Sequence, residues 1–518
     1  MYRSAEDLVR EASEMYTELL ESFSGVTLVD RVLPGQEDTT ETVCDPTPAQ
    51  IENAEALNER YARWVRIVAA YLERVQIGHS GLFAEQAEQL TSYFLFQRSG
   101  RNITHELWRA LFFRESRQIL AGLVQIVAEN SDEFAVNSST GVTFLDLDVR
   151  MTRARDEYVI NVDSTLGSAA GTLVLPYDPR DVENFVLRHC SPRGAVRRAV
   201  PNSIAPFSKF GGALFDALMT GAVRDLYSMT RAHASANRLG IRFRLRQSNV
   251  PELMRIPWEF LFDGSGFICL EPRATLVRHL DMHLAAPALS VQLPLRILVT
   301  ISSPPDLPSL DVKAEADRLR IALGPYIEMG LIDLTIARDG QLATVQRALT
   351  MGQRTGKQWH IWHFIGHGVF DERDRAGYLA FESSYGSRMV SGFEMATLFR
   401  DHDTLRLVVM NACETAASDD VDAMSGIAGA IVERGVPTVV AMQFPVSDDA
   451  AILFAGRFYS SISDGSSVDA AVTEARRAIF FQPNYGEWAT PVVFTRSSAT
   501  EVFNIVPSID GRNEEKGS

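Results

Sequence analysis

Two stretches, WHIWHFIGHG at residues 359–368 and LRLVVMNACET at residues 405–415, decide the fold. Each is largely apolar over the length of a buried strand, and each ends in a reactive side chain, His367 in the first and Cys413 in the second. Buried strands of this kind are typical of parallel sheets, whose functional sites lie beyond the carboxyl ends of the strands. We therefore expect His367 and Cys413 to lie at one edge of a single sheet.

Strand and helix patterns alternate on both sides of these two stretches. Further strands are predicted for LRILVTIS (295–302), LIDLTIA (331–337), YLAFE (378–382), PTVVAMQF (437–444) and PVVFT (491–495). Helical patterns lie between them, near 311–323, 341–350, 392–400 and 422–433 and in two segments that end at about Phe480. The alternation predicts an α/β fold with a largely parallel sheet sandwiched by helices.

The sequence before this region has two other patterns. Residues 140–285 hold short alternating runs such as VTFLDLDV (142–149) and IRFRLR (241–246) around a helical segment at 207–236, which predicts a mixed α/β unit. The first 135 or so residues are helical in pattern, apart from a polar break from Ser24 to Pro46. Three domains and a polar tail are therefore expected.

Composition limits the class of protein. A chain of 518 residues is too long for one hydrophobic core, and a formal charge of −16 argues against nucleic-acid binding, which depends on Lys and Arg. No apolar run is long enough to span a bilayer, and the charged start MYRSAEDLVREASEMY is unlike a signal peptide. The four cysteines have neither disulfide-framework nor zinc-ligand spacing. We expect a cytoplasmic protein that binds neither membrane nor nucleic acid.

His367 and Cys413 have the residue types and spacing of a cysteine peptidase. They are 46 residues apart, and in caspases the histidine precedes the cysteine by about 50. An imidazole that takes the thiol proton creates a nucleophile and later protonates the leaving amine. The oxyanion of the intermediate needs backbone N–H donors, and Gly368 permits a tight turn directly after the histidine.

A metal site is the alternative suggested by His360, His363 and His367. The first two have opposite parity along the strand, and no HExxH motif or carboxylate partner accompanies them. We expect them to be core or sheet-edge residues, and we expect no metal and no cofactor.

Several peptides resemble one known family. WHFIGHG (362–368) and LVVMNACETA (407–416) are similar to the two active-site motifs of the CHAT family, the "caspase HetF associated with TPRs" peptidases of the caspase, gingipain and separase clan. IRFRLRQSNVPELMRIPWEFLFDGSGFICLEPRATLVRHL (241–280) is similar to the family's upstream portion, and AMQFPVSDDAA (441–451) to its post-catalytic segment. The resemblance covers about residues 140–500. Tetratricopeptide repeats, common in the family, are not evident in the N-terminal region.

The resemblance implies roles for particular residues. His367 would be the general base, Cys413 the nucleophile, and the backbone N–H groups of Gly368 and Cys413 the oxyanion donors. Gln443 and Phe444 stand where many relatives carry Trp, so the substrate groove is expected to differ there. In this family the upstream unit can be a degenerate copy of the peptidase fold.

These implications complete the predicted domain organisation. It comprises a helical regulatory or partner-binding domain (1–138), an α/β pseudo-peptidase-like domain (139–286), a caspase-like peptidase domain (287–507) and a polar tail (508–518).

The acidic run SDDVD at 418–422 has two interpretations. Asp419 and Asp420 are candidates for a pocket that takes a basic substrate side chain. Alternatively the run caps the helix predicted to start there, which we prefer because carboxylates favour the first turn of a helix.

The sequence as a whole predicts a cysteine endopeptidase that cleaves a specific protein partner. We expect its N-terminal helical domain to receive an activating protein or signal, and bacterial defence or controlled cell death is a plausible setting from the family. A non-catalytic scaffold that binds a partner is the rival hypothesis. A nucleotide-binding enzyme is disfavoured because no GxGxxG or GxxxxGK[ST] motif follows a strand.

Overall fold

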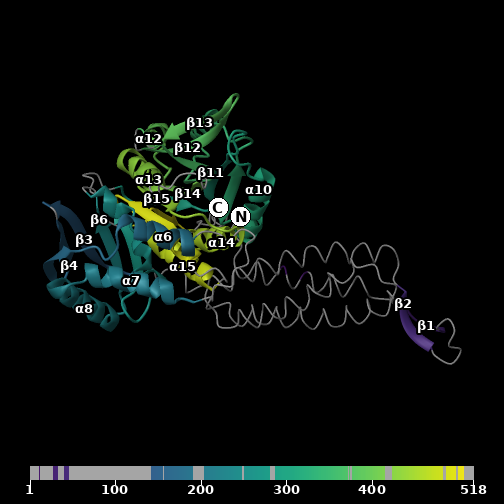
Figure 1. Ribbon diagram of the computed structural model, residues 1–518. Coiled ribbons are helices and arrows are strands. Elements are labelled where there is room, and N and C mark those ends of the chain that lie inside the picture. The colour runs from purple at the N-terminus through teal and green to yellow at the C-terminus, as the bar shows by residue number, and fades with distance from the viewer. Residues whose placement is uncertain are drawn as a thin grey trace, which may run out of the picture. The chain divides into compact units, whose positions relative to one another are not determined.

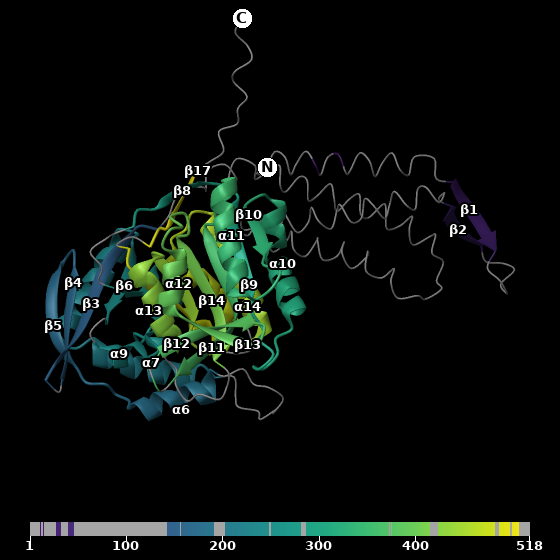
Figure 2. The same ribbon diagram turned by 90° about the horizontal axis from the view of Figure 1, so that it is seen from above.

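The computed structural model (Figures 1 and 2) describes part of the chain, namely residues 11, 14, 27–32, 40–45, 142–155, 157–190, 203–247, 250–280, 286–371, 373, 376–414, 423–481, 486–497 and 500–506. Of the predicted N-terminal helices only Glu11 and Glu14 are described, and both are helical. The polar tail lies outside the described residues. The chain divides into two units, Met1–Thr140 with Glu328–Gly330 and the remainder, which are described separately.

The first unit contains a β-hairpin. Strands β1 (Thr27–Val32) and β2 (Thr40–Asp45) pair antiparallel, with Thr27 opposite Asp45. Both strands are rich in Thr and Val, which favour extended backbone. We predicted only a break in the helical pattern here, so the hairpin is an addition to that prediction.

The second unit is built on one large sheet. Among the described residues the sheet has thirteen strands, in the order β10-β9-β11-β14-β15-β16-β7-β6-β3-β4-β5, and a β12–β13 hairpin is attached to β11. The bounds are β3 Phe144–Ala154, β4 Glu157–Ser164, β5 Gly167–Leu173, β6 Gly240–Arg246, β7 Ala274–His279, β9 Leu295–Ile301, β10 Ile332–Ile336, β11 Ile361–Asp371, β12 Ala376–Ser383, β13 Gly386–Ser391, β14 Leu407–Glu414, β15 Thr438–Met442 and β16 Pro491–Thr495.

Most neighbouring strands in this sheet are parallel. Strands β10, β9, β11, β14 and β15 form one parallel set, and β16, β7, β6 and β3 form another. The two sets meet at the antiparallel pair β15–β16. The predicted α/β fold with a largely parallel sheet between helices is confirmed.

Helices cover both faces of the first parallel set (Figure 1). Side chains of α11 (Leu342–Thr355), α12 (Gly392–Phe399) and α13 (Ala423–Arg434) join one buried apolar cluster with Trp362 and Phe364 of β11. On the opposite face lie α14 (Asp448–Ser463) and, packed beside it, α10 (Val312–Glu328). The alternation of side chains along β11 explains this arrangement, because successive residues face opposite layers.

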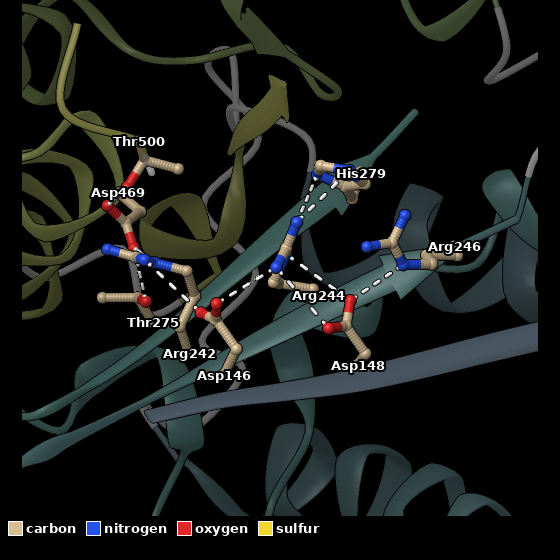
Figure 3. A network of polar contacts seen from close by, with 9 residues as sticks. All are labelled: Asp146, Asp148, Arg242, Arg244, Arg246, Thr275, His279, Asp469 and Thr500. Atoms are coloured by element: carbon tan, nitrogen blue, oxygen red, sulfur yellow. Dashed lines mark hydrogen bonds and ion pairs between the residues drawn. The ribbon is translucent and has the colours of Figure 1, made fainter. Parts of the chain in front are cut away.

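In the second parallel set, α8 (Gly221–Ala236) packs on one face of β6 and β3, and α7 (Ala205–Leu218) packs on β5 of the same sheet, while the other face of β6 and β3 carries polar side chains. The alternating sequence of β6 directs Arg242, Arg244 and Arg246 to that polar face, where they pair with Asp146 and Asp148 of β3 (Figure 3). The network continues into α15 (Val468–Phe480), because the fully buried Asp469 accepts a 2.7 Å hydrogen bond from Arg242 Nε. Helix α15 is thereby tied to the upstream strands.

Some elements were not predicted from the sequence. They include α6 (Pro179–His189), strands β7 and β13, the four-residue helix α9 (Pro251–Met254), and a separate parallel pair formed by β8 (Leu289–Gln292) and β17 (Phe503–Val506). The boundaries proposed for the domains at 139–286 and 287–507 stay predictions. In the described part of the chain, no helix is long and apolar enough to cross a membrane.

Candidate active site

His367 and Cys413 are direct neighbours in the sheet. Strands β11 and β14 pair in parallel from Ile361 opposite Leu407, and this register places the Cα atom of His367 opposite that of Cys413. Paired positions of parallel strands fall on the same face of a sheet. The backbone therefore brings the two predicted positions together at the carboxyl end of the parallel set, as expected. The side chain of Cys413 lies outside the described residues.

Strand β11 changes its pairing partner beside His367, from β9 to β12. Strand β9 pairs with β11 only as far as Ile301 opposite Ile365, and the amide of Ser302 then donates to the Ile365 carbonyl at 2.8 Å. From His367 onward β12 takes the place of β9, with Ala380 opposite His367. The Ser302 hydroxyl joins the two neighbours of β11, because it donates to the Ala380 carbonyl at 2.8 Å. The chain leaving β9 is thus directed over the histidine.

A backbone carbonyl on this departing chain orients the His367 ring. His367 is 5% exposed, and its Nε2 lies 2.7 Å from the carbonyl oxygen of Pro308. A carbonyl only accepts, so Nε2 carries the hydrogen. In the neutral ring Nδ1 is then the acceptor, which is the form that a general base requires.

The segment that carries Pro308, residues 303–310, is fixed at several points. The Glu382 carboxylate on β12 accepts from the Ser303 amide at 3.1 Å, and the Ser303 hydroxyl accepts from the Leu310 amide at 2.9 Å. At the outer edge Asp306 accepts from the Ser387 hydroxyl of β13 at 2.8 Å. Hydrogen bonds from Ser387 lower the pKa of Asp306, so this exposed carboxylate is ionised. We call residues 303–310 the orienting loop.

His363 of β11 and His360, directly before this strand, are buried. The Tyr459 hydroxyl of α14 lies 2.8 Å from Nδ1 of His363, and burial lowers the pKa of His363 to about 4. Burial and the nearby Arg296 lower the pKa of His360 to about 3. They are core residues, as predicted. Within the described ranges, no group of three or more His, Cys, Asp or Glu side chains is arranged to hold a metal ion.

The predicted turn after His367 is wrong. Strand β11 continues through Gly368 to Asp371, because it gains β12 as a new partner. Gly368 is opposite Glu414 on β14 and Leu379 on β12. The role of its N–H group, like that of Cys413, as an oxyanion donor stays a prediction.

The candidate pocket residues differ in their surroundings. Asp419 and Asp420 lie outside the described residues. Phe444 is buried, and Gln443 directly follows β15 at the same end of the sheet as Cys413. The Gln443 side chain donates to Glu259 at 2.9 Å and to the Ala489 carbonyl at 2.8 Å. Their part in substrate binding stays a prediction.

Two parts of this arrangement have no recognisable pattern in the sequence. The Pro308 carbonyl is a backbone atom 59 residues before His367, so no side-chain pattern reveals it. Glu382 ends the predicted strand YLAFE, and nothing in the sequence marks its carboxylate as part of the site. A topological signal was available, because a loop that leaves the strand next to β11 passes over the carboxyl end of β11.

Comparison with solved structures finds matches of low similarity. Two are structures of the Saccharomyces cerevisiae separase–securin complex, each 11% identical, with TM-scores of 0.37 and 0.35; each match covers 94% of this chain and 40% of the other. The chain thus spans well under half of those proteins. A third, entitled "Structure of Protease", is 11% identical with a TM-score of 0.33, and the match covers 54% of this chain and 68% of that one.

Comparison with protein families is more informative. No curated protein matches the chain. Residues 208–495, more than half of the 518, match the CHAT domain, and this range contains β11, β14 and the orienting loop. The family is of the caspase-like protease type, in agreement with the resemblance of the two active-site peptides. The chain belongs to the CHAT domain family.

Proposed function

We propose that this protein is a cysteine endopeptidase in which Cys413 is the nucleophile and His367 the general base. The observation that carries the proposal is the pairing of these two positions across β11 and β14, together with the 2.7 Å contact of His367 Nε2 with the Pro308 carbonyl. A histidine whose Nε2–H is already engaged has Nδ1 available to take a proton. The family is consistent with this chemistry.

In the proposed reaction the thiol proton of Cys413 passes to Nδ1 of His367. The thiolate attacks the peptide carbonyl carbon, and the resulting oxyanion is held by backbone N–H groups, for which Gly368 and Cys413 are the candidates. When the C–N bond breaks, the imidazolium gives its proton to the leaving amine. Water, deprotonated by His367, then attacks the thioester, and the C–S bond breaks to release the acid and the thiol.

The finer parts of the proposal concern regulation. We propose that the substrate is a specific protein partner and that an activating protein or signal acts through residues 1–138. A role in bacterial defence or controlled cell death fits what the family resemblance implies. The protein is proposed to act in the cytoplasm.

The test is cleavage of protein and peptide libraries by the wild-type chain, Cys413→Ala and His367→Ala. Each single variant is expected to lose activity by about as much as the double variant, because the two groups act as one unit. His233→Ala, at an exposed position of α8, is the matched control and should retain wild-type activity. Substantial turnover by either purified dyad variant would refute the assignment.

A thiol-reactive probe separates the peptidase from the rival scaffold. The peptidase is expected to label rapidly at Cys413, and labelling should fall in His367→Ala. Cys190 and Cys269 are poor competitors because both are buried; burial raises the pKa of Cys269 to about 12 and also raises that of Cys190. In a non-catalytic scaffold the probe would label Cys413 slowly, and the rate would be the same in His367→Ala.

A further inference from the structure

The Glu382 carboxylate bridges two backbone amides on different loops. Its Oε1 accepts from the amide of Ser303, the first residue of the orienting loop, at 3.1 Å. Its Oε2 accepts from the amide of Gly340, in the loop after β10, at 3.1 Å. The Glu382 amide also donates to the Gly340 carbonyl at 2.9 Å. One side chain therefore holds together β12 and the chains that leave β9 and β10.

This junction is tightly packed around Gly340. A Cβ atom at that position would lie 2.6 Å from Ser302 Cα, 2.8 Å from the Ile301 carbonyl oxygen and 2.9 Å from Glu382 Cδ. A Cβ atom essentially never approaches other atoms this closely, so the backbone approach depends on glycine. Gly340 therefore lies close to both the end of β9 and the Glu382 carboxylate.

Glu382 is also closely linked to His367 through the sheet. It lies two residues beyond Ala380, which is opposite His367 in the β11–β12 pair. The start of the orienting loop is thus attached to the strand that pairs with the histidine, and the same loop returns to place the Pro308 carbonyl on Nε2. The His367 ring is thus positioned by its own strand pairing with β12 and, through Glu382 and the orienting loop, by the Pro308 carbonyl.

We propose that Glu382 is a positioning residue that sets the orientation of His367 through the orienting loop. The inference rests on the proposed roles of His367 and Cys413. Glu382 does not touch the reacting atoms. It fixes the Ser303 end of a short loop whose carbonyl selects the ring form in which Nδ1 accepts the thiol proton.

The substitution Glu382→Gln tests this with the smallest change of shape. Both partners of the carboxylate are N–H donors, and a carboxylate accepts from both. An amide offers one acceptor oxygen and turns its NH₂ group toward the other donor, so one of the two loop ends is released. A displacement of about 1 Å at a catalytic group costs up to about a hundredfold in rate. We expect kcat to fall by about tenfold or more, and KM to stay within about twofold.

The second readout is the rate at which iodoacetamide alkylates Cys413, followed by mass spectrometry of that residue. At neutral pH, Glu382→Gln is expected to react several-fold more slowly than the wild type, because a misplaced imidazole supports less thiolate. Near pH 10 the thiol ionises without help, so the two rates should converge. Convergence separates loss of activation from a change in access.

Glu394→Gln is the matched control. The Glu394 carboxylate accepts from the Ser391 amide at 2.9 Å and from its hydroxyl at 3.0 Å, in the capping box of α12. This variant loses a carboxylate bonded to backbone N–H, as Glu382→Gln does, and therefore reports the effect of reduced stability alone. It should leave both kcat and the alkylation rate at wild-type values.

Ser303→Ala supplies an independent variant of the same loop. It removes the hydroxyl that accepts from the Leu310 amide and leaves Glu382 intact, so a smaller change in the same direction is expected. Wild-type alkylation and kcat in folded Glu382→Gln and Ser303→Ala would overturn the inference. Should the wild type cleave no substrate, the alkylation rates still decide it: a fast, His367-dependent thiol slowed by Glu382→Gln supports the positioning role, whereas a thiol indifferent to His367 overturns the dyad itself.

Discussion

His363 lies four residues before His367 on the same strand and contributes to stability in a pH-dependent way. Burial holds its pKa at about 4, against an ordinary value of 6.5, so the folded protein keeps the ring neutral where the unfolded chain would protonate it. Unfolding therefore takes up a proton below about pH 6.5, and stability falls with pH until about pH 4. Over this pH range the shifted pKa of His363 lowers the free energy of unfolding by about 3 kcal/mol.

This dependence is measurable by urea unfolding at pH 7.5 and pH 4.5. His363→Gln should lose less stability between the two pH values than the wild type does, because glutamine has no proton to gain and can still accept from Tyr459. His233→Gln, at an exposed position, should follow the wild type. An equal loss in wild type and His363→Gln would contradict the prediction.

At the scale of elements, a buried ion pair connects β7 to the short helical turn Trp258–Phe260. Arg278 Nη2 lies 3.1 Å from Glu259 Oε2, and both side chains are almost completely buried. Gln443 bonds to both partners. Removing one member of such a pair leaves a buried charge without its partner, which typically costs about 3–5 kcal/mol.

Glu259→Gln should therefore lower the free energy of unfolding by several kcal/mol in urea titrations. Glu474→Gln is the control: Glu474 is paired with Arg477 at 2.8 Å on the exposed side of α15, where such a pair contributes about 1 kcal/mol or less. The double variant Glu259→Met with Arg278→Met should recover part of the loss. An equal loss in the free energy of unfolding for Glu259→Gln and Glu474→Gln would show that the buried pair contributes no more than the exposed one.

Element by element, predictability followed the strength of the local pattern. Strands β9, β11, β14 and β16 are runs of buried apolar residues that only a covered sheet explains, so they could be predicted. Strand β13 (GSRMVS) is short and partly exposed. The β8–β17 pair joins segments more than 200 residues apart, so neither strand carries a local signal.

In the candidate site, the side chains could be predicted from the sequence and the backbone contacts could not. His367 and Cys413 were identifiable because their residue types and positions suffice to suggest chemistry. The Pro308 carbonyl and the amides of Ser303 and Gly340 belong to groups that every residue has. The role of these groups depends on where the chain leaves β9, and only the three-dimensional structure shows that position.

At the scale of the whole molecule, we expect residues 1–138 to control the proposed peptidase activity. The orienting loop and both dyad positions lie at strand ends, where small displacements stop catalysis. The 518-residue chain should therefore have low basal activity that rises with a partner. A truncated chain starting at Ser138, assayed on the same substrate at equal concentration, should have altered basal activity and no response to the partner. High activity of the 518-residue chain without response to any partner would contradict the prediction.

The junction of β16 with β7 has a consequence for the independence of the two halves of the sheet. Strand β16 lies where the two parallel sets meet, with the antiparallel β15 on one side and the parallel β7 on the other. All five of its residues, PVVFT, are buried, and none is charged. A fragment cut out at residue 287 would expose this strand as a bare apolar edge, the kind of edge on which chains assemble into insoluble aggregates. The strands upstream of residue 287 thus protect the rest of the sheet from aggregation, and we expect a fragment that starts at residue 287 to be less soluble than the 518-residue chain.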